Sequence, residues 1–340
     1  MDRTTLLNEL LRRNREADLA SGPLGNNHGP MTLLALERMG APDERLKAYF
    51  ATLEPRFGKQ AFDLAKTGPL DEANWREHLG GFAWFPRYVE FFEARERELG
   101  LEATLRAYLP GMLSGLAGHA FHPLLRLGYA LDAGNRDECV YALAYWAATW
   151  LPSPAYDAGA APVAPGELLA NARDALKDLP LEMSGNIVNR LRTVYAQPAF
   201  AAALKPVRFP DERPLAEASG LLLEAFRKTH NFTLLHAVTS CQALRLILPY
   251  AGERDAALNA FWHAVCAAWI TVEKSGRELE RDTAAPGALG WDEAFAKAAE
   301  TLNEHTIKLV YTCRLEARCY GRPAYLDLAA RECATPAPFF

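Results

Sequence analysis

The chain has 340 residues, 50% of them hydrophobic and 23% charged, a composition that suits a globular protein with a large core. Its 37 basic and 42 acidic residues give a net charge of −5, so nucleic acid and anionic membranes are not expected as partners. The first residues lack the apolar stretch of a secretory signal. The longest apolar stretches are interrupted before they reach the roughly 20 residues of a membrane span. We therefore expect a cytoplasmic protein.

The 3.6-residue hydrophobic period of α-helices dominates along the chain, as in TLLNELLRRNREADL, YVEFFEARERELG and CVYALAYWAATW. Short alternating runs of β-branched residues between turn signals are absent. This pattern predicts an all-α fold without a significant β-sheet, in a single domain that covers residues 1–340. The Pro- and Ala-rich stretch at 151–165 reads as a long loop and is the expected boundary between two halves.

Four stretches share one order, in which a His is followed by an apolar helix, a Gly and a second helix. The His and Gly are 12 residues apart in the first two stretches and 16 apart in the last two (His28/Gly40, His122/Gly134, His236/Gly252 and His305/Gly321). Each stretch predicts a helical hairpin with Gly ending its first helix. Such hairpins must pack together to bury their apolar faces, so we expect a helical bundle built from repeated hairpins.

The four histidines head equivalent predicted helices. If these helix starts converge, four imidazoles point at one centre, and neutral imidazole is a ligand for iron, zinc, copper and nickel. The alternative for each histidine is an ordinary surface or core position. A protein with that arrangement would be a helical-repeat interaction scaffold without chemistry. The spacing alone names neither the metal nor the reaction.

Three further side chains accompany these histidines. His119 precedes His122 by three residues, so either of them, or both, could face the centre. Lys308 follows His305 by three residues, and a buried lysine beside a metal would lose its proton and could take up carbon dioxide as a carbamate; a solvated cation is the alternative. Arg126, one turn past His122, could pair with a phenolate or carboxylate of a substrate, or it could be a structural arginine.

Several metal and nucleotide motifs are absent. The chain has no Glu-x-x-His signature of di-iron bundles, no HExxH helix, no His-Asp pair, no P-loop and no GxGxxG. A site that is rich in histidine and poor in carboxylates favours a mononuclear metal centre.

Four motifs together resemble the questin oxidase-like family, from about Asn26 to about Arg331: NNHGPMTLLALERMGA, HAFHPLLRLGYALDAG, LLHAVTSCQALRLILP and HTIKLVYTCRLEA. The family is associated with oxidative ring opening of anthraquinone-type aromatic polyketides in fungi, and it has many bacterial members, of which this chain looks like one. The resemblance implies a non-haem iron centre with histidine ligands and a carboxylated lysine. Arg126 stands where fungal members tend to have a second histidine.

Residue by residue, the resemblance places metal ligands at His28, His122, His236 and His305, with Lys308 as the carbamate. It implies an iron(II)-dependent oxygenase, of dioxygenase or Baeyer–Villiger type, that takes dioxygen and an aromatic substrate. His119 and Arg126 are the expected catalytic side chains, and Asn27, Thr239 and Glu304 are expected to orient the imidazoles. A zinc hydrolase with the same ligands is the alternative enzyme.

Overall fold

The computed structural model describes residues 3–16, 27–56, 62–209, 214–275 and 289–336. These residues form sixteen α-helices and several short 3₁₀ turns, and no β-strand occurs among them, which confirms the all-α fold. The α-helices are, in chain order, α1 (Arg3–Asn14), α2 (Gly29–Arg38), α3 (Asp43–Leu53), α4 (Phe85–Leu99), α5 (Leu101–Tyr108), α6 (His122–Ala133), α7 (Arg136–Thr149), α8 (Pro165–Leu176), α9 (Ile187–Tyr195), α10 (Pro198–Ala203), α11 (Pro214–Thr229), α12 (Phe232–Ile247), α13 (Arg254–Lys274), α14 (Trp291–Glu300), α15 (Glu304–Tyr320) and α16 (Ala324–Ala334).

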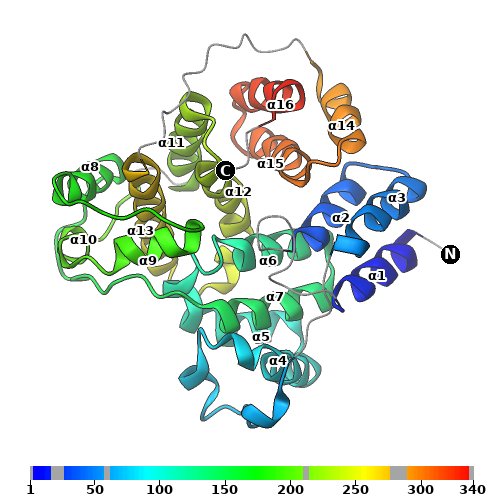
Figure 1. The fold of residues 1–340 in the computed structure, drawn as a ribbon, viewed down its shortest axis with the longest axis horizontal. Coiled ribbons are helices and arrows are strands. Elements are labelled where there is room, and N and C mark those ends of the chain that lie inside the picture. Colours follow the sequence, from blue (N-terminus) through cyan, green and yellow to red (C-terminus); the bar gives the residue numbers. More distant parts are fainter. Residues whose placement is uncertain (1–2, 17–26, 57–61, 210–213, 276–288, 337–340) are drawn as a thin grey trace.

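Four helices from distant parts of the chain meet at the centre of the molecule. Helix α2 packs on α6, α6 on α12, α12 on α15, and α15 again on α2, so the four form a closed ring. Figure 1 shows the remaining helices outside this ring, with α1 and α3 beside α2, α4 and α5 below α7, and α14 and α16 beside α15. A separate group beside α12, on the left in Figure 1, consists of α8, α9, α10 and α13.

Each helix of the central ring is the first helix of one predicted hairpin. The partner helices are α3, α7, α13 and α16, and each packs on the first helix of its pair. The glycine before every partner helix has a positive φ, between 67° and 83° (Gly40, Gly134, Gly252 and Gly321). A Cβ at Gly40, Gly134 or Gly321 would meet nothing within 4 Å, so the left-handed backbone, and not crowding, favours glycine there.

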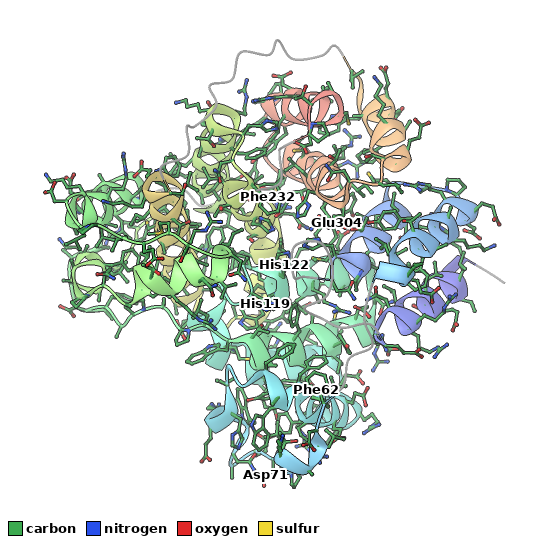
Figure 2. The ribbon with its side chains drawn as sticks, viewed as in Figure 1. Phe62, Asp71, His119, His122, Phe232 and Glu304 are labelled. Carbon is green, nitrogen blue, oxygen red and sulfur yellow. The ribbon has the colours of Figure 1, made fainter. Side chains whose placement is uncertain are left out.

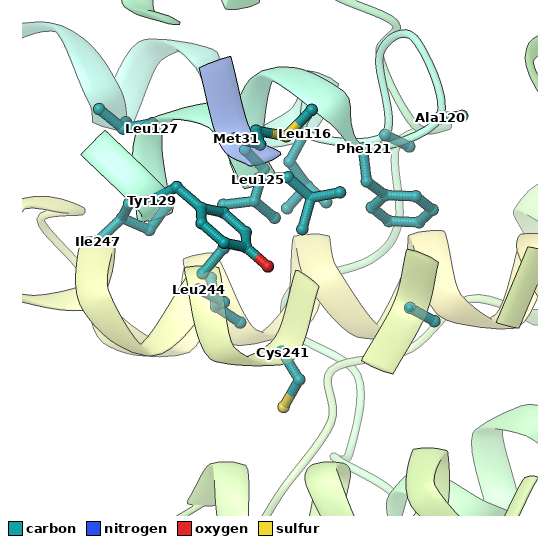
Figure 3. Close-up of a cluster of buried hydrophobic side chains, with 14 of the residues drawn as sticks. Met31, Leu116, Ala120, Phe121, Leu125, Leu127, Tyr129, Cys241, Leu244 and Ile247 are labelled. Carbon is teal, nitrogen blue, oxygen red and sulfur yellow. The ribbon is translucent and has the colours of Figure 1, made fainter. Parts of the chain in front are cut away.

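The contact between α6 and α12 is unusually close. A Cβ on Gly128 of α6 would lie 2.5 Å from the Cβ of Ala243 on α12, so two small residues let these backbones approach each other. Leu125 and Tyr129 of α6 lie close to α12, and Leu244 of α12 lies beside Tyr129 (Figure 3). This packing fixes how the start of α6 lies against α12, which decides where their histidines meet.

One cluster of buried hydrophobic side chains extends from Leu6 in α1 to Ala329 in α16. Of the predicted loop at 151–165, residues 151–164 connect α7 to α8, which begins at Pro165, and Val163 forms an isolated bridge with Val207. The assignment of the whole chain to a single domain stays a prediction. The segment Phe232–Tyr250 is long and apolar enough to span a membrane by length and composition, but 78% of its apolar window is buried inside the protein, as in a core helix.

Candidate metal centre

The four histidines expected to converge are neighbours where α2, α6, α12 and α15 meet. Their rings form a closed cycle with centroid distances of 4.7, 5.0, 5.5 and 4.6 Å, in the order His28, His122, His236, His305 and back to His28. None of these side chains is more than 2% exposed. Figure 2 shows His122, Phe232 and Glu304 together at this central point. An interaction scaffold would have left the four histidines apart or at the surface.

Two of the histidines lie at helix starts, and the residues next to them in sequence favour a helix start there. His28 is the N-cap residue of α2 and is followed by Gly29 and Pro30; a Cβ on Gly29 would lie 2.3 Å from Oδ1 of Asn14, so any larger residue would displace the Asn14 side chain. His305 is the second residue of α15. The Asn303 side chain caps that helix by accepting hydrogen bonds from the His305 and Thr306 amides.

The other two histidines differ from each other in position. His122 is the first residue of α6, as expected. His236 does not open its helix, because α12 begins at Phe232 after the capping side chain of Asn231. His236 therefore lies one turn inside α12, and its ring reaches the centre from the second turn of the helix.

Three of the four imidazoles have their Nδ1 atoms engaged by an acceptor. His122 Nδ1 donates to the carbonyl of His119 at 2.5 Å, and His236 Nδ1 donates to the carbonyl of Phe232 at 2.9 Å. A carbonyl can only accept, so both rings carry the proton on Nδ1 and a lone pair on Nε2. His28 Nδ1 lies 2.5 Å from Oε1 of Glu304, the carboxylate–histidine arrangement that orients metal ligands.

The Nε2 atoms of two of these rings face each other: those of His28 and His122 are 2.6 Å apart, in a buried environment. If Glu304 holds the proton of neutral His28 on Nδ1, both Nε2 atoms present lone pairs, and two facing lone pairs repel unless a cation lies between them. The Nε2 atom of His236 is buried without a hydrogen-bond partner. Ligand nitrogens of His28, His236 and His305 lie within 4.8 Å of one another.

Burial keeps all four imidazoles neutral. It lowers the pKa of His28 below its usual value of 6.5, that of His236 to about 3, and the pKa values of His122 and His305 well below 6.5. The positive charge of Lys308 contributes to the lowering at every one of them. Neutral imidazole is the form that binds a metal ion, so the environment supplies the ligands in the required state.

Lys308 belongs to the same buried cluster. Its side chain is 2% exposed, and burial lowers the pKa of the ammonium from 10.5 to about 8, against an opposing effect of Glu304. A substantial fraction of the amine is therefore neutral near pH 8, which a solvated lysine would not be. The backbone around it is held by Tyr129, whose hydroxyl donates to the Lys308 carbonyl at 3.0 Å.

His119 and Arg126 have different surroundings from the four histidines. The His119 imidazole is directed to the hydroxyl of Tyr145 on α7, 2.6 Å from Nδ1. Arg126 is buried and donates from Nε and Nη2 to Glu138, at 3.0 and 2.7 Å, while its Nη1 has no hydrogen-bond partner. Its guanidinium also lies over the ring of Tyr141. The catalytic roles expected for His119 and Arg126 stay predictions.

Of the three residues expected to orient the imidazoles, Glu304 contacts one of the four rings, that of His28. Asn27 accepts from the Gly29 amide, and the Thr239 hydroxyl donates to backbone carbonyls of its own helix. Sequence reasoning missed Phe232, whose ring packs on His236 and His305 at 4.8 and 4.7 Å. Its position four residues before His236, on the same helix face, was the available signal.

The fold and this centre define an all-helical protein with a buried, histidine-lined site. Residues 26–313 match the sequence profile of the family described as Questin oxidase-like, and the chain belongs to this family. A search of curated proteins found no match. Membership implies an oxidoreductase, of the oxidase or oxygenase kind, that acts on a small molecule.

Proposed function

We propose that the protein is a non-haem iron-dependent oxygenase acting on a flat aromatic, anthraquinone- or polyketide-like substrate. The observation that carries the proposal is the arrangement of His28, His122 and His236. Each has its Nδ1 engaged by an oxygen acceptor; the Nε2 atoms of His28 and His122 face each other, and Nε2 of His236 is buried without a hydrogen-bond partner. Two facing lone pairs and one unpaired buried nitrogen are costly, and a metal ion would satisfy all three.

The residues present fit a transition metal of the iron, zinc, copper or nickel group, because neutral imidazole suits all four. His28, His122, His236 and His305 would hold the ion, and Lys308 would join them as a neutral amine or as a carbamate. When bound, iron(II) would supply the activation of dioxygen. The choice of iron over zinc rests on the oxidoreductase family, since the ligand atoms alone do not separate the two metals.

The protein's own groups have defined tasks in this proposal. Glu304 and the carbonyls of His119 and Phe232 hold three rings in the tautomer that exposes Nε2. The apolar surroundings of the centre exclude bulk water, and Phe232 covers one side of two rings. Arg126 keeps one free donor atom, Nη1, with which it could bind an oxygen of the substrate.

Metal analysis tests the proposal directly. Protein expressed in iron-replete medium and purified without oxygen is expected to contain about one equivalent of iron. The nitric oxide adduct of the purified protein should give the EPR signal of high-spin iron, and a hydroxyanthraquinone should stimulate oxygen uptake. His236→Ala should lose the metal, whereas His78→Ala should keep it, because the His78 ring stacks on Trp84 and is not one of the four converging rings. Folded protein without iron would refute the proposal, and stoichiometric zinc with esterase activity would favour the hydrolase.

A further inference from the structure

The backbone directly before His122 has a conformation that ordinary residues avoid. His119, Ala120 and Phe121 are consecutive and none is glycine, yet their φ angles are 46°, 58° and 66°. L-residues adopt this left-handed region as isolated cases, because Cβ then approaches the following carbonyl. Three in succession persist only where the surrounding structure holds them, and such strain is concentrated at functional sites.

The left-handed turn gives His122 its hydrogen-bond acceptor. Because of the turn, the carbonyl of His119 lies 2.5 Å from Nδ1 of His122 and also accepts from the His122 amide at 3.3 Å. In a continuous right-handed helix, that carbonyl would point along the axis to a later amide. The turn thus fixes the proton of His122 on Nδ1 and turns Nε2 toward His28, 2.6 Å away.

Helix α7 holds the turn in place. The hydroxyl of Tyr145 hydrogen-bonds Nδ1 of His119 at 2.6 Å, and the two rings meet edge to face at 5.6 Å. One turn further along α7, the carbonyl of Thr149 would lie 2.2 Å from a Cβ on Gly118, so glycine lets the chain approach α7 there. Tyr145 is 3% exposed, and His119 is half-buried, so the hydrogen bond between them is partly shielded from water, which strengthens it.

We propose that Tyr145 is a positioning residue for the metal centre and acts on His122 through His119. Its hydroxyl anchors the His119 imidazole, the anchored residue keeps the left-handed turn, and the turn presents the His119 carbonyl to His122. Without the anchor, His122 gains access to the tautomer with the proton on Nε2, which blocks the ligand lone pair. The role of His119 in this chain is carried by its backbone carbonyl.

The test is Tyr145→Phe, which removes one oxygen and keeps the ring. Tyr88→Phe is the matched control, because the Tyr88 hydroxyl is equally buried and donates to the Trp75 carbonyl at 2.7 Å on another helix. Long-range ¹H–¹⁵N NMR of the metal-free proteins reports the tautomer of His122. We expect the proton on Nδ1 in the wild type and in Tyr88→Phe, and a mixture of both tautomers in Tyr145→Phe.

The second measurement is the affinity for cobalt(II), by chelator competition. This part of the inference rests on the proposed metal site. Loss of a hydrogen bond that orients a metal ligand typically weakens metal binding by about 10- to 100-fold. We expect that loss in Tyr145→Phe and less than about twofold change in Tyr88→Phe. If the wild type binds no metal, the proposed function fails, but the NMR tautomer still decides this inference.

An unchanged His122 tautomer in Tyr145→Phe would overturn the positioning role. The same holds for a cobalt(II) affinity equal to that of Tyr88→Phe. If Tyr145→Phe does not fold, His119→Asn replaces it, because asparagine tolerates the left-handed region and removes only the anchored ring. The expectation for His119→Asn is the same mixed tautomer, and a retained Nδ1 proton would again contradict the proposal.

Discussion

Replacement of Lys308 by methionine tests whether the centre buries a positive charge when no metal is bound. Burial lowers the pKa of Lys308 from 10.5 to about 8. The difference of about 2.5 units corresponds to about 3 kcal/mol of unfavourable free energy for the charged form, at 1.36 kcal/mol per unit. Methionine has a similar length and no charge, so metal-free Lys308→Met should be more stable than metal-free wild type at pH 7 by up to about 3 kcal/mol.

The pH dependence of stability tests independently whether charged Lys308 destabilises the folded protein. Between pH 8 and 10.5 the unfolded chain holds a proton on Lys308 that the folded chain has lost, so the stability of the wild type should rise with pH in this window. Lys308→Met lacks this rise, and the two stabilities should converge above about pH 10.5. Groups that titrate elsewhere act in both proteins and cancel in the difference.

The assay is equilibrium urea unfolding, followed by tryptophan fluorescence, from pH 7 to 11 in buffer that contains chelator and no carbon dioxide. Removal of carbon dioxide keeps Lys308 as an amine. The reasoning is refuted if Lys308→Met is less stable than the wild type at pH 7 while the two pH curves run parallel. That result would mean that the lysine amine forms favourable contacts in the metal-free protein that outweigh its desolvation.

Further predictions concern the same centre and the helices that form it. Glu304→Gln should weaken metal binding by about 10- to 100-fold in chelator competition, because Glu304 orients His28; unchanged affinity would contradict this. Below pH 6.5 the metal-free protein should lose stability as pH falls, because burial depresses the pKa of His236 to about 3; His236→Leu should show a shallower loss in acid unfolding, and an equal one would refute the assignment. Gly128→Ala should cost about 1–3 kcal/mol in urea unfolding, because its Cβ would lie 2.5 Å from that of Ala243, whereas Gly166→Ala, where a Cβ meets nothing within 4 Å, should not destabilise.

The carbamate has its own test. In ¹³C-labelled bicarbonate, the wild type is expected to show a carbamate resonance that Lys308→Met lacks, because a neutral amine is the form that adds to carbon dioxide. Lys297 is a useful control, since it lies on the outer helix α14 and its replacement should leave the resonance in place. A wild-type spectrum without the resonance would leave Lys308 as an amine.

The sequence by itself determined the helices and their pairing. Helical periodicity is a local property of the sequence. Each hairpin is also marked by one glycine, such as Gly134 or Gly321, whose positive φ ends the first helix. For that reason the all-α fold and the four hairpins could be predicted from the sequence alone. The four motifs also indicated the family, since they occur in one order along most of the chain.

Only the tertiary structure decided which atoms meet. Spacing left His119 and His122 equivalent, and the left-handed turn held against Tyr145 directs one ring to the centre and the other to α7. The tertiary structure also paired Arg126 with Glu138 across the α6–α7 hairpin, where the sequence left open a substrate contact or a structural arginine. The depressed pKa of Lys308 likewise depends on burial by helices that are distant in sequence. Periodicity determines which face of a helix is buried. The packing of four helices that are distant in sequence determines which imidazole nitrogens face one another.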